Sequence, residues 1–312
     1  MFERRKIMLD GILPIYKERG MTSHDVVFKL RKILKIKKIG HAGTLDPDVD
    51  GVLLVLLGNS TKVSDYAMNL GKSYRAEICL GISTITQDIS GQILSEKVVE
   101  KVDISDIKYA CSKLIGKIIQ KPPIYSAVKV NGKKLYEYAR EGKFDVQIPE
   151  REIEIYSINL LEYTCYYENE KFYFTIDVSC GKGTYIRTIA TQLGDILNLP
   201  SCMSKLTRTS SGDIKISDCF SISYVEENRD NISKKLLSKE YALSSYQFVE
   251  LPKFRAKQVI NGLRFRKNQF PDIDFSSEVV FTYNNEAIAV YYLKELTDEL
   301  LSVKTTFPKN IE

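Results

Sequence analysis

The clearest hydrophobic pattern of the chain lies between residues 22 and 57. Apolar residues recur at helical intervals after Thr22, and Thr22 and Asp25 have the spacing of a capping box. The pattern predicts a helix whose buried face carries Val26, Val27, Leu30, Ile33 and Leu34. Residues 52–57 then form an uninterrupted apolar run, which predicts a buried strand.

Alternating patterns dominate the rest of the chain. Residues 74–78 and 172–178 alternate between apolar and polar positions, which predicts two strands. Further strands are predicted at residues 8–16, 153–161, 278–283 and 287–293, with Asn284–Asn285 as the turn between the last two. Helices are predicted at residues 102–119, capped by Asp103 or Ser105, and from residue 186 onward.

The segment at residues 226–245 is polar and charged, and it predicts a domain boundary. After it the pattern restarts with a short helix, an Asn261–Gly262 turn and the hairpin at residues 278–293. We therefore expect a large domain at residues 1–245 and a small β-rich domain at residues 246–312. The fold class that this predicts is α+β, with a mixed, largely antiparallel sheet flanked by helices.

Composition narrows the class of protein. With 312 residues, 44% hydrophobic and 27% charged, the chain has an ordinary globular composition, and its net charge of +5 suits an anionic partner. Its six cysteines include no CxxC pair and it has two histidines, so we expect no metal site. Asp10 and Gly11 interrupt the apolar run of the basic N-terminus, which is therefore not read as a signal peptide. No membrane span is predicted, and scattered cysteines fit a cytoplasmic location.

The candidate chemistry lies on the turn that precedes the apolar run at residues 52–57. Pro47 excludes Asp46 from helical backbone angles, and Gly43 and Gly51 allow sharp bends on either side. Asp46 is thus presented on a constrained turn at the mouth of a strand, as a reactive carboxylate would be. Taken alone, an Asp-Pro pair between apolar runs is more often an ordinary turn.

The longer string around this turn favours the reactive carboxylate over the ordinary turn. GHAGTLDPDVDGVL followed by GNSTK at residues 40–62 resembles the catalytic motif of the TruB family of pseudouridine synthases. Four further strings resemble family motifs in the same order, at residues 72–74 (KSY), 83–91 (STITQDISG), 180–188 (CGKGTYIRT) and 206–212 (LTRTSSG). The resemblance covers about residues 8–213, and this chain departs from the usual family residue at Glu18, Val49, Ser60 and Gly181.

The resemblance implies a role in one active site for particular residues of these motifs. Asp46 is the catalytic carboxylate, Arg187 is the arginine paired with it, and Tyr74 lies against the uracil. Because a buried carboxylate tends to become protonated, we expect Arg187 to keep Asp46 charged in a dry pocket. The substrate-binding residues that the resemblance implies are His41, which fills the space left by the flipped base, together with Lys17, Asp88, Tyr185 and Leu206.

Residues 121–151 combine two prolines, an Asn131–Gly132 hairpin signal and a helix rich in Tyr, Lys and Arg. Aromatic residues among cations suit base stacking and phosphate contacts, although composition alone favours a solvated excursion. In the family, the matching segment is a mobile insert that clamps the RNA. The small domain after residue 245 resembles the PUA domain of bacterial TruB proteins, mainly by its position.

The activity implied is isomerisation of uridine to pseudouridine at position 55 in the T-arm of tRNA. This reaction needs no cofactor, and we expect a monomer without an obligatory protein partner. A guide-dependent synthase acting on ribosomal RNA and a non-catalytic RNA-binding protein are the alternatives. The sequence leaves open whether Asp46 attacks the base, attacks the sugar carbon or removes a sugar proton.

Overall fold

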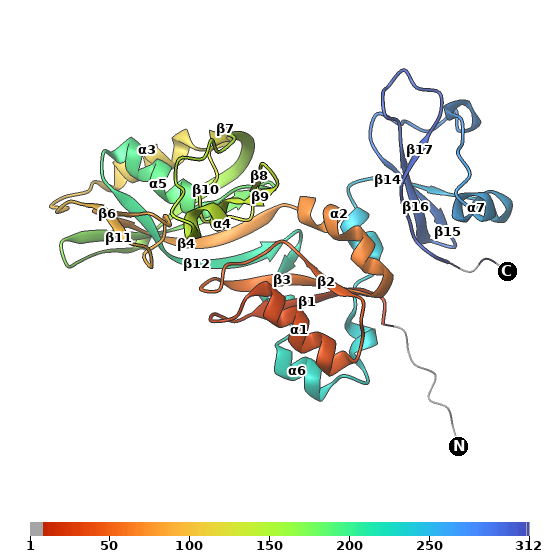
Figure 1. The fold of residues 1–312 in the computed structure, drawn as a ribbon, viewed down its shortest axis with the longest axis horizontal. Coiled ribbons are helices and arrows are strands. Elements are labelled where there is room, and N and C mark those ends of the chain that lie inside the picture. Colours follow the sequence, from red (N-terminus) through yellow and green to blue (C-terminus); the bar gives the residue numbers. More distant parts are fainter. Residues whose placement is uncertain (1–8, 310, 312) are drawn as a thin grey trace.

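The computed structural model describes residues 9–309 and 311, and Figure 1 shows their arrangement. Met8, the predicted start of the first strand, and most of the segment judged against a signal peptide lie outside the described residues. Within them, no helix is both long and apolar enough to cross a membrane. A long sheet runs through the larger part of the molecule, and a second, smaller sheet forms a separate lobe at the C-terminal end (Figure 1).

The large sheet has nine strands, and its main path follows the order β1-β3-β12-β4-β11-β10-β7. Its strands are β1 (Gly11–Lys17), β2 (Ile39–Ala42), β3 (Asp50–Leu57), β4 (Lys72–Leu80), β7 (Gly116–Gln120), β10 (Arg151–Glu168), β11 (Lys171–Cys180), β12 (Ser201–Ser211) and β13 (Ile214–Lys215). All pairings are antiparallel except the short contact between β3 and β12, which is parallel. The expected mixed, largely antiparallel sheet is confirmed.

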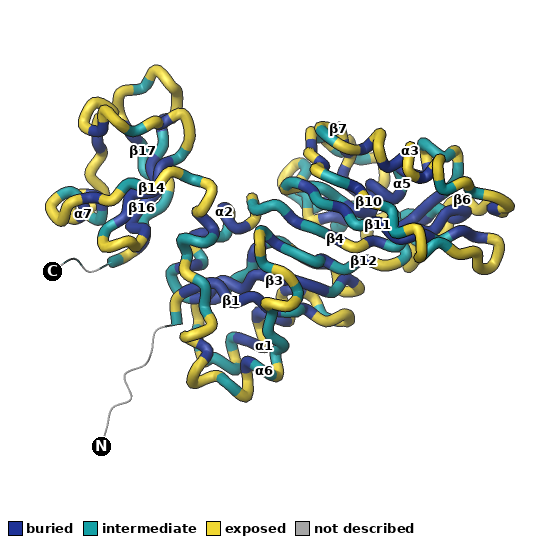
Figure 2. Tube along the Cα trace, turned by 180° about the vertical axis from the view of Figure 1, so that it is seen from behind, coloured by how far each residue is buried: buried dark blue, intermediate teal, exposed yellow. Residues whose placement is uncertain are grey.

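Strand β3 is buried on both faces, which explains its uninterrupted apolar sequence. Val52, Leu54 and Leu56 face one hydrophobic cluster, whereas Leu53, Val55 and Leu57 face another. The second cluster is closed by α1 (Ser23–Leu34) and α6 (Ile222–Glu227), and the first by α2 (Ser64–Asn69). The dark core along the strands is visible in Figure 2. The predicted capping box at the start of α1 is confirmed, with Thr22 and Asp25 bonded reciprocally.

The other half of the sheet carries a third cluster. Helices α3 (Ile104–Lys113) and α5 (Ile186–Leu197) cover β4, β10 and β11 there. The helix predicted at residues 102–119 is too long, because its last apolar residues form edge strand β7 instead. Its Asp103 occupies the N-cap position but makes no side-chain capping bond.

Several shorter elements complete this part of the molecule. They are β5 (Ile82–Thr84), β6 (Ile93–Glu96), β8 (Lys129–Val130), β9 (Lys133–Lys134) and α4 (Leu135–Arg140). The predicted Asn131–Gly132 turn joins β8 and β9, and both residues have the positive φ that such a tight turn needs.

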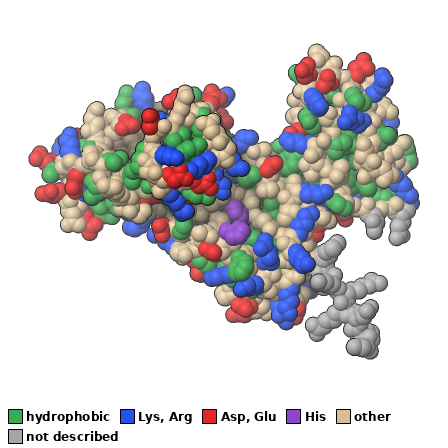
Figure 3. Space-filling view, viewed as in Figure 1, with side chains coloured by type: hydrophobic (Ala, Val, Ile, Leu, Met, Phe, Trp, Pro, Cys, Tyr) green, Lys and Arg blue, Asp and Glu red, His purple; other side chains and the backbone are tan. Residues whose placement is uncertain are grey.

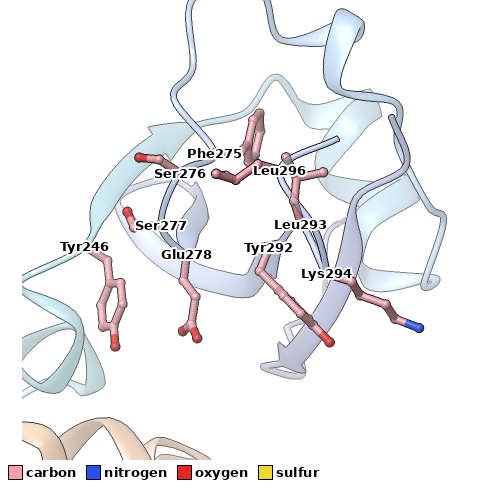
Figure 4. Close-up of a pocket in the computed structure, with 9 residues that line it drawn as sticks. All are labelled: Tyr246, Phe275, Ser276, Ser277, Glu278, Tyr292, Leu293, Lys294 and Leu296. Atoms are coloured by element: carbon pink, nitrogen blue, oxygen red, sulfur yellow. The ribbon is translucent and has the colours of Figure 1, made fainter. Parts of the chain in front are cut away.

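The C-terminal lobe contains a four-stranded sheet and α7 (Lys253–Ile260). Its strands are β14 (Gln247–Glu250), β15 (Val279–Tyr283), β16 (Glu286–Tyr292) and β17 (Ser302–Thr306), so the predicted hairpin at residues 278–293 is confirmed. Tyr246, Glu278 and Tyr292 help to line a cavity of about 440 Å³ in this lobe (Figure 4).

The polar segment before this lobe is more than a linker. Ala242 and Leu243 are fully buried or nearly so, and they join a cluster that also contains Val290 and Phe307 of the small sheet. Lys62 Nζ donates to the carbonyl of Thr306 across the same junction. The two lobes therefore share part of one hydrophobic core.

Candidate active site

The loop between β2 and β3 presents Asp46 at the surface, and buried donors hold its backbone from below. Lys17 Nζ donates to the carbonyls of Val49 (2.6 Å) and Pro47 (3.2 Å). Ser23 Oγ accepts from the Leu45 amide at 2.9 Å and donates to the Leu45 carbonyl at 3.3 Å. These contacts fix the backbone on both sides of Asp46.

Arg208 of β12 holds the two ends of the same loop. Its Nε donates to the Val52 carbonyl at 2.6 Å, and its Nη2 donates to the Gly43 carbonyl at 3.2 Å. The side chain is almost completely buried, with 1% of the residue exposed. Gly51 makes this arrangement possible, because it lies against the backbone of Arg208 with a φ of 116°.

A Gly51→Ala substitution should therefore destabilise the fold. A Cβ at this position would lie 2.1 Å from the Arg208 carbonyl oxygen, and the positive φ would be strained as well. We expect a loss of about 2 kcal/mol or more in the free energy of unfolding, measured with urea. Gly20→Ala is the matched control, because Gly20 has a φ of 83° but no atom within 4 Å of the added Cβ. Equal losses in the two variants would show that the contact between β3 and β12 does not constrain Gly51.

The structure brings Asp46 and Arg187 together. Arg187 Nη2 lies 3.2 Å from Asp46 Oδ2, and its Nη1 lies 3.7 Å from Asp88 Oδ2. The guanidinium also donates to the carbonyls of Thr86 (3.0 Å) and Tyr125 (2.9 Å). Arg187 thus joins three loops, whose sequences are far apart, at the position of Asp46.

Tyr74 lies in one row of cross-strand neighbours with two of the buried cations. The row crosses five neighbouring strands of the sheet, with one residue from each strand directly opposite the next: Val178, Tyr74, Arg208, Gly51 and Lys17. Burial raises the pKa of Tyr74, and the charge of Arg208 opposes this rise only in part. Tyr74 is therefore a neutral phenol at pH 7 that packs in the same cluster as Leu45 and Val49 of the Asp46 loop.

His41 and Lys72 border the same region. Burial and the neighbouring Arg208 lower the pKa of His41, and its Nδ1 is a buried atom without a hydrogen-bond partner among the described residues. Burial, together with Arg208, lowers the pKa of Lys72 to about 8, and Lys72 Nζ donates to the carbonyls of Met68 and Leu70. His41 is consequently neutral and half-buried beside the loop.

The remaining predicted site residues have distinct positions. Asp88 accepts from the hydroxyls of Thr86 and Ser90 in the loop that Arg187 also contacts. Leu206 is buried in the cluster that contains Tyr74. Tyr185 precedes α5 and exchanges two hydrogen bonds with Gln120. The guanidinium carbon of Arg151 lies over the Tyr185 ring, 5.6 Å from the centre of that ring.

The structure adds detail to two expectations about the local environment. Lys17, expected among the substrate-binding residues, is completely buried, and its amine donates to carbonyls of the Asp46 loop. The Asp46 side chain is 51% exposed, so the free protein does not enclose it in a dry pocket. Arg187, which is 8% exposed, orients this carboxylate from the protein side.

Three residues that support the Asp46 loop were not predicted from the sequence: Ser23, Asp50 and Arg208. Asp50 accepts from Tyr16 (2.7 Å) and Thr207 (2.6 Å), and although burial works against its ionisation, these bonds lower its pKa. Arg208 lies inside the string at residues 206–212 that resembles a family motif, but the string alone does not show which carbonyls its side chain reaches.

The chain has relatives among known proteins. The sequence profile of "TruB family pseudouridylate synthase (N terminal domain)" matches residues 31–186. The chain is 45% identical over 307 residues to tRNA pseudouridine synthase B of Staphylococcus aureus strain MSSA476, covering 96% of this chain and 100% of the relative. The protein of the same name from strain JH9 gives the same values.

Solved structures share the fold. A chain of a Cbf5–Nop10–Gar1 complex superimposes with a TM-score of 0.70 and 25% identity, covering 96% of this chain and 86% of that chain. A chain of the archaeal box H/ACA sRNP Nop10–Cbf5 complex gives a TM-score of 0.69 and 22% identity, with coverage of 96% and 87%. These likenesses extend through both lobes described above.

Proposed function

The chain belongs to the TruB family of pseudouridylate synthases, and on this premise we propose that it isomerises the uridine at position 55 in the T-arm of tRNA, with Asp46 as the catalytic carboxylate. The contact between Asp46 and Arg187 carries the proposal. It places an oriented carboxylate at the surface, beside a buried phenol, on a loop whose backbone is fixed. An RNA-binding protein without catalysis has no need of such a construction.

The reaction is an isomerisation, so its atoms balance without an oxidant or reductant. The bond from N1 of uracil to C1′ of the ribose breaks, a bond from C5 to C1′ forms, C5 loses a proton and N1 gains one. Asp46 acts at the ribose or the base as nucleophile or base, and Arg187 holds it there. Tyr74, as a neutral phenol, lies against the uracil and takes part in proton movement at C5. No cofactor enters this scheme.

We assign the remaining site residues to the flipped nucleotide. A base that leaves its stack costs a few kcal/mol, which contacts in the pocket must offset. His41, neutral and half-buried, fills the vacated space, while Leu206 and Tyr185 wall the pocket and Asp88 fixes the outer side of Arg187. Lys17 acts indirectly, through the backbone of the Asp46 loop.

The surface charge supports an RNA partner. Exposed lysines follow α1 and the turn after it, next to the hollow that contains the two histidines, and blue side chains continue towards the C-terminal lobe (Figure 3). These lysines are Lys29, Lys32, Lys35, Lys37 and Lys38. A row of cations beside an exposed carboxylate suits a phosphate backbone that passes the site.

We propose that residues 1–245 form the catalytic domain and that residues 246–312 form a PUA-like RNA-binding domain. We also propose that the protein acts as a monomer without an obligatory protein partner, and that it works in the cytoplasm.

The test is incubation with an unmodified tRNA transcript, without added metal, followed by mapping of pseudouridines. We expect one modification, at position 55, and none in a transcript with cytidine at that position. A T-arm hairpin should be modified as well. Modification elsewhere in the tRNA, or only in ribosomal RNA, would contradict the proposed substrate.

We propose that the segment at residues 121–151 clamps the RNA. Deleting residues 128–143 should weaken binding and flatten its salt dependence, because five basic side chains leave with it: Lys129, Lys133, Lys134, Arg140 and Lys143. Each lost phosphate contact lowers the slope of log K against log salt by about 0.7–0.9. Fluorescence anisotropy at several salt concentrations measures this slope.

The control for this deletion removes charge alone, as Lys129→Gln with Arg140→Gln. Leu135 and Ala139 of the segment are buried, yet they belong to none of the hydrophobic clusters that pack on the large and the small sheet, so the shortened protein should fold. Tyr125, which accepts from Arg187, is retained. An unchanged slope in both variants would mean that this segment does not touch the phosphates.

A further inference from the structure

The Asp46 loop is held at both ends by a single buried side chain. Arg208 bonds to the carbonyl of Gly43, where the loop leaves β2, and to the carbonyl of Val52, where it has entered β3. Lys17 and Ser23 hold the carbonyls between these points. The order of supports along residues 43–52 is therefore Arg208, Ser23, Lys17 and again Arg208.

We propose that Arg208 is a positioning residue for the reaction, whose guanidinium fixes both ends of the loop and thereby sets the place of Asp46 relative to Tyr74 and Arg187. This inference rests on the proposed role of Asp46. Arg208 is directly opposite Tyr74 on one side and Gly51 on the other, so it is the residue of the sheet that connects the buried phenol with the loop.

The chemistry of the guanidinium explains why arginine stands here. Its planar group presents five N–H donors in a fixed geometry, so it can reach two carbonyls that face it from different segments. Arg208 is buried, and the carbonyls of Val52 and Gly43 accept from its guanidinium. A buried cation is costly unless its donors are satisfied, so Arg208 depends on these two loop carbonyls as they depend on it.

The surroundings of Arg208 are consistent with this role. His41 and Lys72 lie nearby and their pKa values are lowered in part by its charge, while Tyr74 is its cross-strand partner. Gly43 lies against the guanidinium, since a Cβ there would be 3.3 Å from Nη1. A substitution of Arg208 should therefore alter the position of the Asp46 loop and of Tyr74, and leave the exposed lysines that we propose to bind RNA unchanged.

The experiment compares Arg208→Lys and Arg208→Gln with the parent protein, using the full chain. Arg75→Lys and Arg75→Gln are the matched controls: Arg75 is on the neighbouring strand, opposite Thr207, but is half exposed and paired with Asp177. Three quantities are measured: hydrogen–deuterium exchange of peptides covering residues 43–52, the dissociation constant for a tRNA transcript, and the single-turnover rate at saturating protein.

For the Arg208 variants we expect exchange in residues 43–52 to accelerate by at least about tenfold, while exchange in α5 stays unchanged. The single-turnover rate should fall by about 100-fold, because small displacements of a reacting group are that costly, and the dissociation constant should change by less than about threefold. Arg208→Lys should retain more of the rate than Arg208→Gln, since it keeps the positive charge, although its ammonium donates from one point and cannot span both carbonyls. The Arg75 variants should match the parent in all three quantities.

Several results would overturn the inference. Unchanged exchange in residues 43–52 would show that Arg208 does not fix the loop, whatever happens to the rate. A loss of RNA affinity equal to the loss of rate would make Arg208 a binding residue. Failure of both Arg208 variants to fold, seen as lost circular dichroism, would assign the side chain to general stability. If the parent itself does not modify tRNA, the proposed function fails, and the exchange measurement still decides whether Arg208 holds the loop.

Discussion

Asp46→Asn protein should bind tRNA and leave its uridine unchanged. The amide is nearly isosteric and can still accept a hydrogen bond from Arg187, so the loop should keep its shape. It cannot act as a nucleophile or base, and loss of such a group typically costs about 10⁴-fold or more in rate. RNA affinity should stay within roughly tenfold, because it arises from many phosphate and stacking contacts and not from one carboxylate. Single-turnover kinetics and anisotropy measure the two quantities.

Asp48→Asn is the matched control for this variant. Asp48 is exposed on the same turn, two residues after Asp46, and its substitution changes the charge of the loop by the same amount. We expect it to retain nearly the full rate. Similar losses in both variants would point to the charge of the turn, and appreciable turnover by Asp46→Asn would remove Asp46 from the mechanism.

Arg187→Ala should lower the rate by about 100-fold to 10⁴-fold while the protein remains folded. The substitution removes the cation that orients Asp46, and it also removes the donors to the carbonyls of Thr86 and Tyr125. Because Asp46 is half exposed, the loss should come mainly from misplacement, so the rate should fall by a similar factor at every pH. A single-turnover pH–rate profile on one transcript tests this.

Two further variants sharpen the result. Arg187→Lys should recover only part of the rate, since one ammonium cannot span the carboxylate and two carbonyls as the planar guanidinium does. Lys182→Ala removes an exposed cation five residues earlier and should leave the rate unchanged. If Arg187→Ala weakens RNA binding as much as it slows the reaction, Arg187 contacts the RNA instead. If its rate loss is confined to acid pH, the charge of Arg187 matters more than its geometry.

Local patterns were sufficient for most of the elements. The capping box of α1 and the Asn-Gly and Asn-Asn turns depend on interactions between residues close in sequence, and the apolar run of β3 is continuous along the chain, so the sequence predicts all of them directly. The helix predicted at residues 102–119 failed at its C-terminal end for the opposite reason. Its last apolar residues pair with β10, a strand that begins more than thirty residues later, and tertiary pairing overrides a helical pattern.

The polar segment at residues 226–245 shows the same limit. Its composition is that of a boundary, but Ala242 and Leu243 enter a core shared with the small sheet. Two buried residues in a charged segment give no periodic signal. Their partners in β1, β3 and β16 become visible only once the chain is folded.

The sequence by itself determined the family, the α+β class and the presence of Asp46, Tyr74 and Arg187, because long motifs and short-range patterns carry that information. Only the tertiary structure decided how these residues are held. Asp46 is exposed, Lys17 is buried beneath its loop, and Arg208 bonds to Gly43 and Val52. Each of these features depends on contacts between segments that are tens of residues or more apart in the sequence. A backbone carbonyl can accept a hydrogen bond whatever side chain its residue carries, so the sequence of the loop does not show which side chains donate to it.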